Sequence, residues 1–203
     1  MKIAVIGATG NAGSRIVTEL LSRGHQVLGI ARHPEKMQPR PGLTLTQGDV
    51  KDEASLARLL TGQEAAIHSV RFRDTDAQSA IRAAKKSGIK RFLVVGGAGS
   101  LEVSPGAALI DQPNFPEVAR PEATAGRDFL NTLKTERDLD WTYLSPSAFF
   151  SPGERTGKFR VGKDQLLTAA DGQSKISMED YAIALSDEIE NPKHSRQRFT
   201  VGY

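Results

Sequence analysis

The sequence predicts an α/β fold built on a doubly wound parallel sheet, in a single domain over residues 1–203. Two observations predict it: short apolar runs alternate with amphipathic stretches through the first half, and a glycine-rich turn directly follows the first run. The apolar runs are nearly continuous, as expected for strands that are covered on both faces. The length of 203 residues suits one domain of about 100–200 residues.

Five strands and three helices are expected in the first half. The first helix carries Ile16, Val17, Leu20 and Leu21 at the spacing of one helical face, and Gly24 is placed to end it. The expected strands cover residues 2–6, 26–31, 43–47, 65–70 and 91–95, and the expected helices cover residues 11–23, 52–60 and 74–87. This order is typical of a parallel sheet with helices on both faces.

The second half is less regular and richer in glycine and proline. Residues 96–120 lack a clear period and are expected to form a loop that covers a site. Residues 145–164 form another such stretch, helices are expected at 122–137 and 177–190, and strands at 141–144 and 198–201. We expect residues 146–203 to form a small C-terminal extension that contributes the substrate side.

The composition excludes several classes of function. The chain has no cysteine, which excludes disulfides, thiolate metal sites and a thiol nucleophile. Its 27 Lys and Arg residues against 24 Asp and Glu leave a formal net charge of only +3, so no nucleic-acid partner is expected. The four histidines, at positions 25, 33, 68 and 194, show no metal-ligand spacing, so no metal site is expected.

No apolar run approaches the roughly 18 residues of a membrane span, and no membrane partner is expected. The apolar N-terminus stops at Gly10 and Asn11 and passes into an amphipathic segment, which predicts a buried strand rather than a secretion signal. We therefore predict a cytoplasmic protein. An oligomer is compatible with the sequence, but its size is not readable from it.

The strongest motif is Gly7-Ala8-Thr9-Gly10-Asn11-Ala12-Gly13, directly after the first strand and at the start of the first helix. Gly7 lets the chain turn sharply, Gly10 has no side chain to keep a pyrophosphate away from the backbone, and Gly13 allows close packing of helix and sheet. The helix N-terminus offers unpaired N–H groups to the phosphates. The motif predicts a dinucleotide site; the alternative is a glycine turn that serves packing alone.

The end of the second strand decides which dinucleotide is preferred. Arg32 stands there, about 20 residues beyond the glycines, where a carboxylate would bind the ribose 2′-hydroxyl of NAD. A guanidinium instead suits the 2′-phosphate of NADP. We therefore predict a preference for NADP(H) over NAD(H), with a solvated surface arginine as the alternative.

Other candidate residues also follow strands of the predicted sheet. Asp49 and Val50 follow the third strand at the place of an adenine-flanking turn, although Asp49 could equally cap a helix. Ligands of open α/β sheets bind at the carboxyl ends of strands. The candidates at the ends of the fourth and fifth strands are Ser69, Val70, Arg71 and Gly97.

At this point the chain resembles the short-chain dehydrogenase/reductase superfamily, a Rossmann-type fold. It is most similar to the atypical NAD(P)H-binding branch of proposed NADH-flavin reductases and biliverdin reductase B-like proteins. The resemblance rests on residues 7–13, Gly48-Asp49-Val50, 140–150 and 152–158. It implies that Gly7, Thr9, Asn11, Ala12 and Arg32 hold the adenosine and pyrophosphate, that Ser69 and Val70 line the ribose and nicotinamide side, and that Pro146, Ala148 and Phe149 lie near the nicotinamide.

One departure from the superfamily bears on the reaction. Most members use Tyr-x-x-x-Lys, in which the tyrosine protonates a carbonyl substrate, and none of the three tyrosines here has a lysine four residues on. Hydride transfer to a flavin or quinone yields a delocalised anion that can take its proton from water, so that orientation alone can suffice. No catalytic residue is assigned. The candidate acceptor walls are Phe72, Phe115, Phe149 and Phe150, each of which could instead be core, and the candidates for an anionic group on the acceptor are Arg71 and Arg155.

These observations favour an NADPH-dependent reductase of a flavin, quinone or similar conjugated acceptor. FMN or FAD would be a substrate of this enzyme rather than a bound cofactor. The alternative is a non-catalytic NADP(H) sensor resembling NmrA-like regulators, which the missing Tyr-x-x-x-Lys fits equally well. A sugar-nucleotide epimerase or dehydratase is disfavoured, because it normally needs the missing motif and a longer C-terminal substrate domain.

Overall fold

The computed structural model describes all residues 1–203 and contains a central sheet of eight strands. The strand order is β10-β12-β8-β5-β4-β1-β2-β3, and every pair is parallel except β10 with β12. The strands of this sheet are β1 (Lys2–Ile6), β2 (Gln26–Ala31), β3 (Leu43–Gln47), β4 (Ala65–His68), β5 (Arg91–Val95), β8 (Asp140–Ser145), β10 (Arg160–Gly162) and β12 (Gln197–Gly202). The predicted doubly wound parallel sheet is confirmed.

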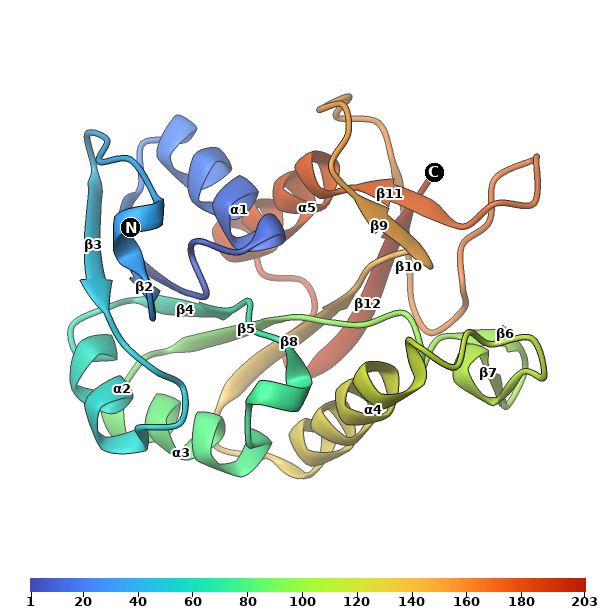
Figure 1. The fold of residues 1–203 in the computed structure, drawn as a ribbon, viewed down its shortest axis with the longest axis horizontal. Helices are drawn as coiled ribbons and strands as arrows, with labels where there is room; N and C mark the ends of the chain where they lie inside the picture. The colour runs from blue at the N-terminus through green and yellow to red at the C-terminus, as the bar shows by residue number, and fades with distance from the viewer.

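Five helices cover the two faces of the sheet (Figure 1). Helices α1 (Asn11–Ser22) and α5 (Met178–Glu190) pack together on one face. Helices α2 (Glu53–Leu60), α3 (Ala77–Ser87) and α4 (Arg120–Thr135) lie on the other. None of the five is long and apolar enough to cross a membrane.

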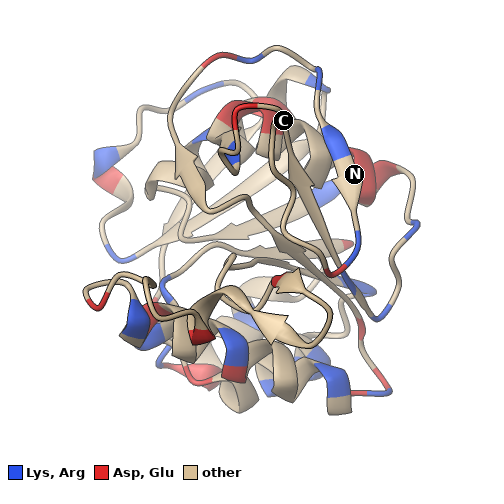
Figure 2. Ribbon diagram, turned by 90° about the vertical axis from the view of Figure 1, so that its right-hand side faces the viewer, with Lys and Arg blue, Asp and Glu red and all other residues tan.

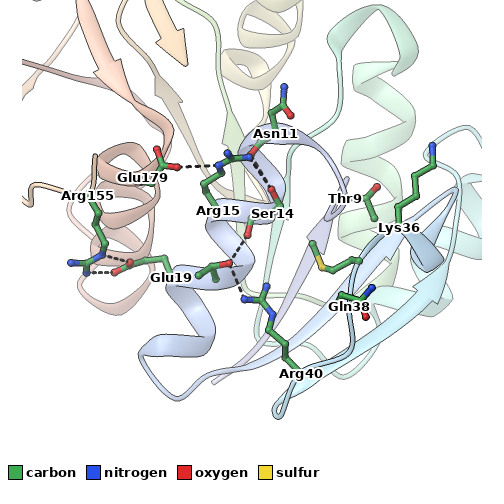
Figure 3. Close-up of a pocket in the computed structure, with 12 residues that line it drawn as sticks. Thr9, Asn11, Ser14, Arg15, Glu19, Lys36, Gln38, Arg40, Arg155 and Glu179 are labelled. Atoms are coloured by element: carbon green, nitrogen blue, oxygen red, sulfur yellow. Dashed lines mark hydrogen bonds and ion pairs between the residues drawn. The ribbon is translucent and has the colours of Figure 1, made fainter. Parts of the chain in front are cut away.

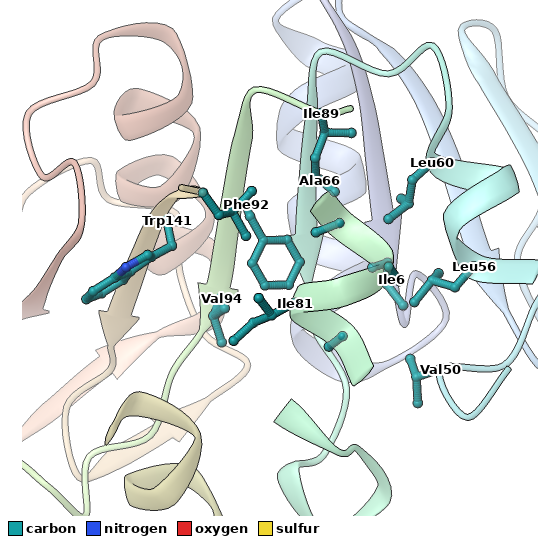
Figure 4. Close-up of a cluster of buried hydrophobic side chains, with 14 of the residues drawn as sticks. Ile6, Val50, Leu56, Leu60, Ala66, Ile81, Ile89, Phe92, Val94 and Trp141 are labelled. Atoms are coloured by element: carbon teal, nitrogen blue, oxygen red, sulfur yellow. The ribbon is translucent and has the colours of Figure 1, made fainter. Parts of the chain in front are cut away.

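The core is divided between these two faces. Ile3 and Val5 of β1 belong to the cluster under α1 and α5, whereas Ala4 and Ile6 belong to the cluster under α2, α3 and α4. Figure 4 shows part of the second cluster, in which Ile6, Leu56 and Phe92 converge from a strand, a helix and a further strand. Both faces of β1 are therefore buried, which explains its continuous apolar sequence.

The boundaries of several elements differ from the prediction, and capping explains two of them. Helix α3 begins at Ala77 rather than at residue 74, because the Asp76 carboxylate accepts a hydrogen bond from the N–H of Ser79. Asp52 likewise caps α2 through the N–H of Ser55. The strand expected at 65–70 ends at His68, and a single 3-10 turn, η2 (Phe72–Asp74), follows it.

Several short strands in the second half were not predicted. They are β6 (Glu102–Ser104), β7 (Ala107–Ala108), β9 (Phe149–Ser151) and β11 (Lys175–Ser177), together with β10 of the central sheet; β9 and β11 pair in parallel, and β6 and β7 form an antiparallel pair. Strands of two or three residues carry almost no periodic signal. Their pairing depends on segments that only the tertiary fold brings together.

Candidate functional site

The strand order reverses direction at β1, which pairs with β2 on one side and with β4 on the other. Ligands of open α/β sheets bind outside the carboxyl ends of the strands at such a switch point. A crevice of about 420 Å³ lies there. It is lined by Gly7, Thr9, Gly10, Arg32, His33, Lys36, Gly48, Asp49, Val50, Lys51, Ser69, Val70, Arg71 and Asp74, together with Ile6, Ile30 and Ala31.

The glycine-rich turn forms the floor of this crevice. The N–H of Gly7 donates to the carbonyl of Ile30 (2.8 Å), and Gly7 has a φ of +85°. A Cβ on Gly7 would lie 2.2 Å from the carbonyl oxygen of Ser69, and one on Gly13 would lie 2.1 Å from the carbonyl oxygen of Gly7. Only glycine therefore allows β4 and α1 to approach the turn this closely.

The N-terminus of α1 points its free donors at the crevice. Gly10 is the N-cap residue and supplies no side-chain acceptor, and the first turn contains no acidic residue. No protein group accepts a hydrogen bond from the N–H of Asn11, Ala12 or Gly13. These donors and the helix dipole suit a pyrophosphate.

Cations outnumber carboxylates around the crevice. Arg32, Lys36, Lys51 and Arg71 line it against Asp49 and Asp74. None of these four cations forms an ion pair within the chain, although basic and acidic residues are interspersed over the rest of the fold (Figure 2). An anionic ligand would meet unpaired positive charge here.

Lys36 was missed by the sequence analysis. It closes the 3-10 turn η1 (Pro34–Lys36), four residues beyond Arg32, so that both side chains border the same crevice. The signal was present in the sequence, as a second cation shortly after the second strand. Lys51 and Asp74 were missed as well, since neither belongs to a recognisable motif.

A second, more open pocket of about 710 Å³ adjoins the crevice along α1 (Figure 3). Thr9 and Lys36 line both spaces. The arginines of the second pocket are engaged: Arg15 with Glu179, and Arg155 with Glu19 through two bonds of 2.8 and 2.9 Å. A third, Arg40, donates to the hydroxyl of Thr18 (3.0 Å).

Arg155 is therefore already paired with Glu19, and its expected role at an acceptor stays a prediction. Its hydrogen bonds hold the pKa of the nearly buried Glu19 carboxyl below its usual range. The surrounding segment, residues 152–158, is fastened in the same way: the N–H of Gly153 donates to Glu179, and both the Thr156 hydroxyl and the N–H of Gly157 donate to Asp180. We call residues 152–158 the strap.

One of the expected acceptor walls, Phe72, belongs to the core, and another, Phe150, is partly buried. Phe72 is only 7% exposed and packs against Phe129 and Tyr143 at ring distances of 5.3 and 6.0 Å. Phe150 packs against Tyr181 at 4.7 Å. The expectation for Phe72 is corrected, because neighbours from distant parts of the chain bury its ring, whereas the role of Phe150 stays a prediction.

The residues expected near the nicotinamide follow β8 and do not line the crevice itself. Pro146 is buried, Ala148 is exposed, and Phe149 is 67% exposed. Gly97, after β5, donates its N–H to the hydroxyl of Tyr143 (2.9 Å). Phe149 is thus an unburied aromatic ring just beyond the carboxyl end of β8.

All three tyrosine hydroxyls are held by protein groups. Tyr143 donates to the carbonyl of Gly126 (3.1 Å), Tyr181 donates to the carbonyl of Leu144 (2.7 Å), and Tyr203 contacts Asp180 (2.8 Å). Burial raises the pKa of Tyr143 and of Tyr181 above the ordinary range. These phenols therefore serve the fold.

Comparison with known proteins gives a consistent family. The sequence matches the NAD(P)H-binding family over residues 7–192. The uncharacterised protein YwnB of Bacillus subtilis is 39% identical over 99% of this chain and 98% of its own. A proposed NADH-flavin reductase from Streptococcus pneumoniae is 36% identical over 100% of this chain and 99% of its own, with a TM-score of 0.87.

Two further solved structures carry different names. A proposed epimerase from Bacteroides thetaiotaomicron is 41% identical, covers 100% of this chain and 96% of its own, and has a TM-score of 0.95. A proposed exported protein from Burkholderia pseudomallei is 43% identical over all of both chains, with a TM-score of 0.91. The cytoplasmic location stays a prediction. The three solved structures share the fold of this chain, and the chain belongs to the NAD(P)H-binding family.

Proposed function

We propose that this protein is an NADPH-dependent reductase that passes hydride to a flavin, a quinone or a similar conjugated acceptor. The observation that carries the proposal is the crevice at the switch point, with free helix N–H groups and unpaired cations, beside a set of tyrosines that are all engaged in the fold. Binding and orientation, without a phenolic acid, are what such a site supplies.

The preference for NADPH over NADH rests on two cations. Arg32 and Lys36 border the crevice beside the end of β2, where the adenosine ribose of a dinucleotide lies in this fold, and neither has a carboxylate partner. A 2′-phosphate would neutralise them through charge-assisted hydrogen bonds. NADH offers only a hydroxyl there, so it would leave both charges without a partner.

The acceptor is proposed to bind beyond β8, against the exposed ring of Phe149 and beside Ala148. Residues 146–203 would then contribute the substrate side. NADPH transfers a hydride to the acceptor and leaves as NADP⁺, and the acceptor takes one proton from water. FMN serves here as a substrate that stacks and departs.

The test is anaerobic oxidation of NADPH by the purified protein, with FMN, riboflavin and a simple quinone, each compared with a reaction without protein. Saturable turnover that is faster with NADPH than with NADH supports both the reductase and the cofactor preference. Tight NADPH binding without turnover on any of the three would contradict the reductase. It would favour a sensor, whose affinity should differ between NADP⁺ and NADPH.

A further inference from the structure

One wall of the cofactor crevice comes from a segment with little structure of its own. After β4 the chain runs through Ser69, Val70 and Arg71 into η2, and Asp74 of that turn reaches the crevice again. A single 3-10 turn of three residues is not stable by itself. Something outside the segment must hold it in place.

The support comes from the first turn of α4. Both carboxylate oxygens of Glu122 accept backbone hydrogen bonds from η2, one from the N–H of Phe72 (2.7 Å) and one from the N–H of Arg73 (3.3 Å). These are the donors that the start of a helical turn leaves without a partner, and they favour a negative charge. Glu122 pairs with no cation, so these are its bonds within the chain.

The side chain of Phe72 fixes the same turn from below. A Cβ on Gly126, one turn further along α4, would lie 2.9 Å from the Phe72 ring, which shows how closely the ring approaches the helix. The crevice residues Arg71 and Asp74 stand directly before and after the two residues, Phe72 and Arg73, that Glu122 holds. Glu122 itself does not line the crevice.

We propose that Glu122 is a positioning residue for the cofactor: its carboxylate preforms the wall of residues 69–74 before the dinucleotide arrives. The inference rests on the dinucleotide site of the proposed function, but not on the acceptor. Without this carboxylate the cofactor must order the wall itself. The apparent affinity then equals the intrinsic affinity multiplied by the fraction of molecules in which the wall is already formed.

The experiment measures NADPH dissociation constants by fluorescence titration for the wild type, Glu122→Ala and Glu122→Gln. We expect about a tenfold weaker constant for the alanine variant, in the range for losing hydrogen bonds to a charged group. Glutamine keeps one oxygen acceptor and should lose about threefold. Glu117→Ala is the matched control, because its carboxylate lies just before α4, is 82% exposed and pairs with Arg120; its constant should stay within about twofold of the wild type.

Amide hydrogen exchange separates positioning from mere stability. In the wild type, the amides of Phe72 and Arg73 should exchange slowly with or without NADPH. In Glu122→Ala they should exchange rapidly in the free protein and slowly with NADPH bound. Unchanged NADPH affinity in both Glu122 variants, whatever their melting temperatures, or an equal loss in Glu117→Ala, would overturn the proposal; a wild type that binds no NADPH would overturn the proposed function as well.

Discussion

The glycine-rich turn leads into α1 and the strap is bonded to it, yet the two segments use their polar groups in opposite ways. Around the turn, the N–H groups of Asn11 to Gly13 and the side chains of Arg32 and Lys36 have no partner within the chain. In the strap, Arg155 and Gly157 each donate to a carboxylate of α1 or α5. Glycines stand close to cations in both places, yet the polar groups around the turn are free and those of the strap are bonded to α1 and α5.

The difference shows how a ligand-binding segment can be told from a structural one with similar composition. Leaving donors and charges unpaired at a surface crevice stabilises nothing in the free protein, so such groups point to a ligand. Donors that already meet carboxylates point to the fold. By this criterion the turn suits the proposed cofactor site, and the strap anchors the C-terminal segment on α1 and α5.

The largest effect is expected from Gly7→Ala, which tests the glycine-rich turn. The new Cβ would meet the Ser69 carbonyl at 2.2 Å at a residue with φ of +85°, so NADPH affinity should fall by at least about a hundredfold. Gly24→Ala is the control, because Gly24 has a similar φ of +79° with no atom within 4 Å, and should cost only about 1 kcal/mol of stability. Titration and thermal unfolding measure both. An equal change in NADPH affinity in the two variants would show that the close approach of β4 to Gly7 has no special role in binding.

His68 also has polar atoms without a partner, since both of its ring nitrogens are buried and unbonded, but it does not line the cofactor crevice. Burial among Phe92 and Phe129 lowers its pKa to about 4, from an ordinary value of 6.5. As the pH falls, His68 therefore takes up a proton in the unfolded chain before it does so in the folded chain. The neutral buried imidazole contributes about 3 kcal/mol to the free energy of unfolding; this contribution is complete above pH 6.5 and disappears towards pH 4.

Urea unfolding of the wild type and of His68→Leu at several values between pH 7.5 and pH 4 measures this contribution. Leucine keeps the site apolar and removes the titration. The wild type should lose about 3 kcal/mol more than the variant over this range. Parallel pH profiles would mean that His68 is protonated or partnered in the folded protein.

A smaller effect is expected from Arg32→Glu, which tests one of the unpaired cations beside the glycine-rich turn. The variant replaces the proposed phosphate ligand with a like charge, so the NADPH dissociation constant should rise about thirtyfold, whereas that for NADH should change less than about threefold. Fluorescence titration with both cofactors measures the ratio. An equal loss for both would remove Arg32 from the 2′-phosphate role.

Arg155→Ala should give the smallest change in cofactor binding, because this arginine belongs to the strap and is already paired with Glu19. The Arg155 side chain is 57% exposed in its ion pair with Glu19. Loss of this pair should therefore cost about 1 kcal/mol of stability and leave the NADPH dissociation constant within about twofold of the wild type. Melting temperature and titration measure the two quantities. A large loss of NADPH affinity would show that the strap is part of the site after all.

Much of the cofactor half could be predicted from local sequence. The expected strands at 2–6, 26–31, 43–47 and 91–95 match β1, β2, β3 and β5 to the residue. Buried parallel strands carry a continuous apolar signal, and glycines that permit close approach leave a fixed spacing in the chain. Arg32 was found for the same reason, since its place follows from the end of a recognisable strand.

The prediction was weaker wherever a side chain's role depends on distant residues. Phe72 is a core residue because Gly126, on another helix, leaves room for its ring, and Arg155 is engaged because Glu19, 136 positions earlier, faces it. The parallel sheet, the glycine turn and the position of the crevice follow from local sequence, because they depend on periodicity and backbone geometry. Which charges and rings remain free for a ligand depends on tertiary contacts, because folding places distant groups beside them.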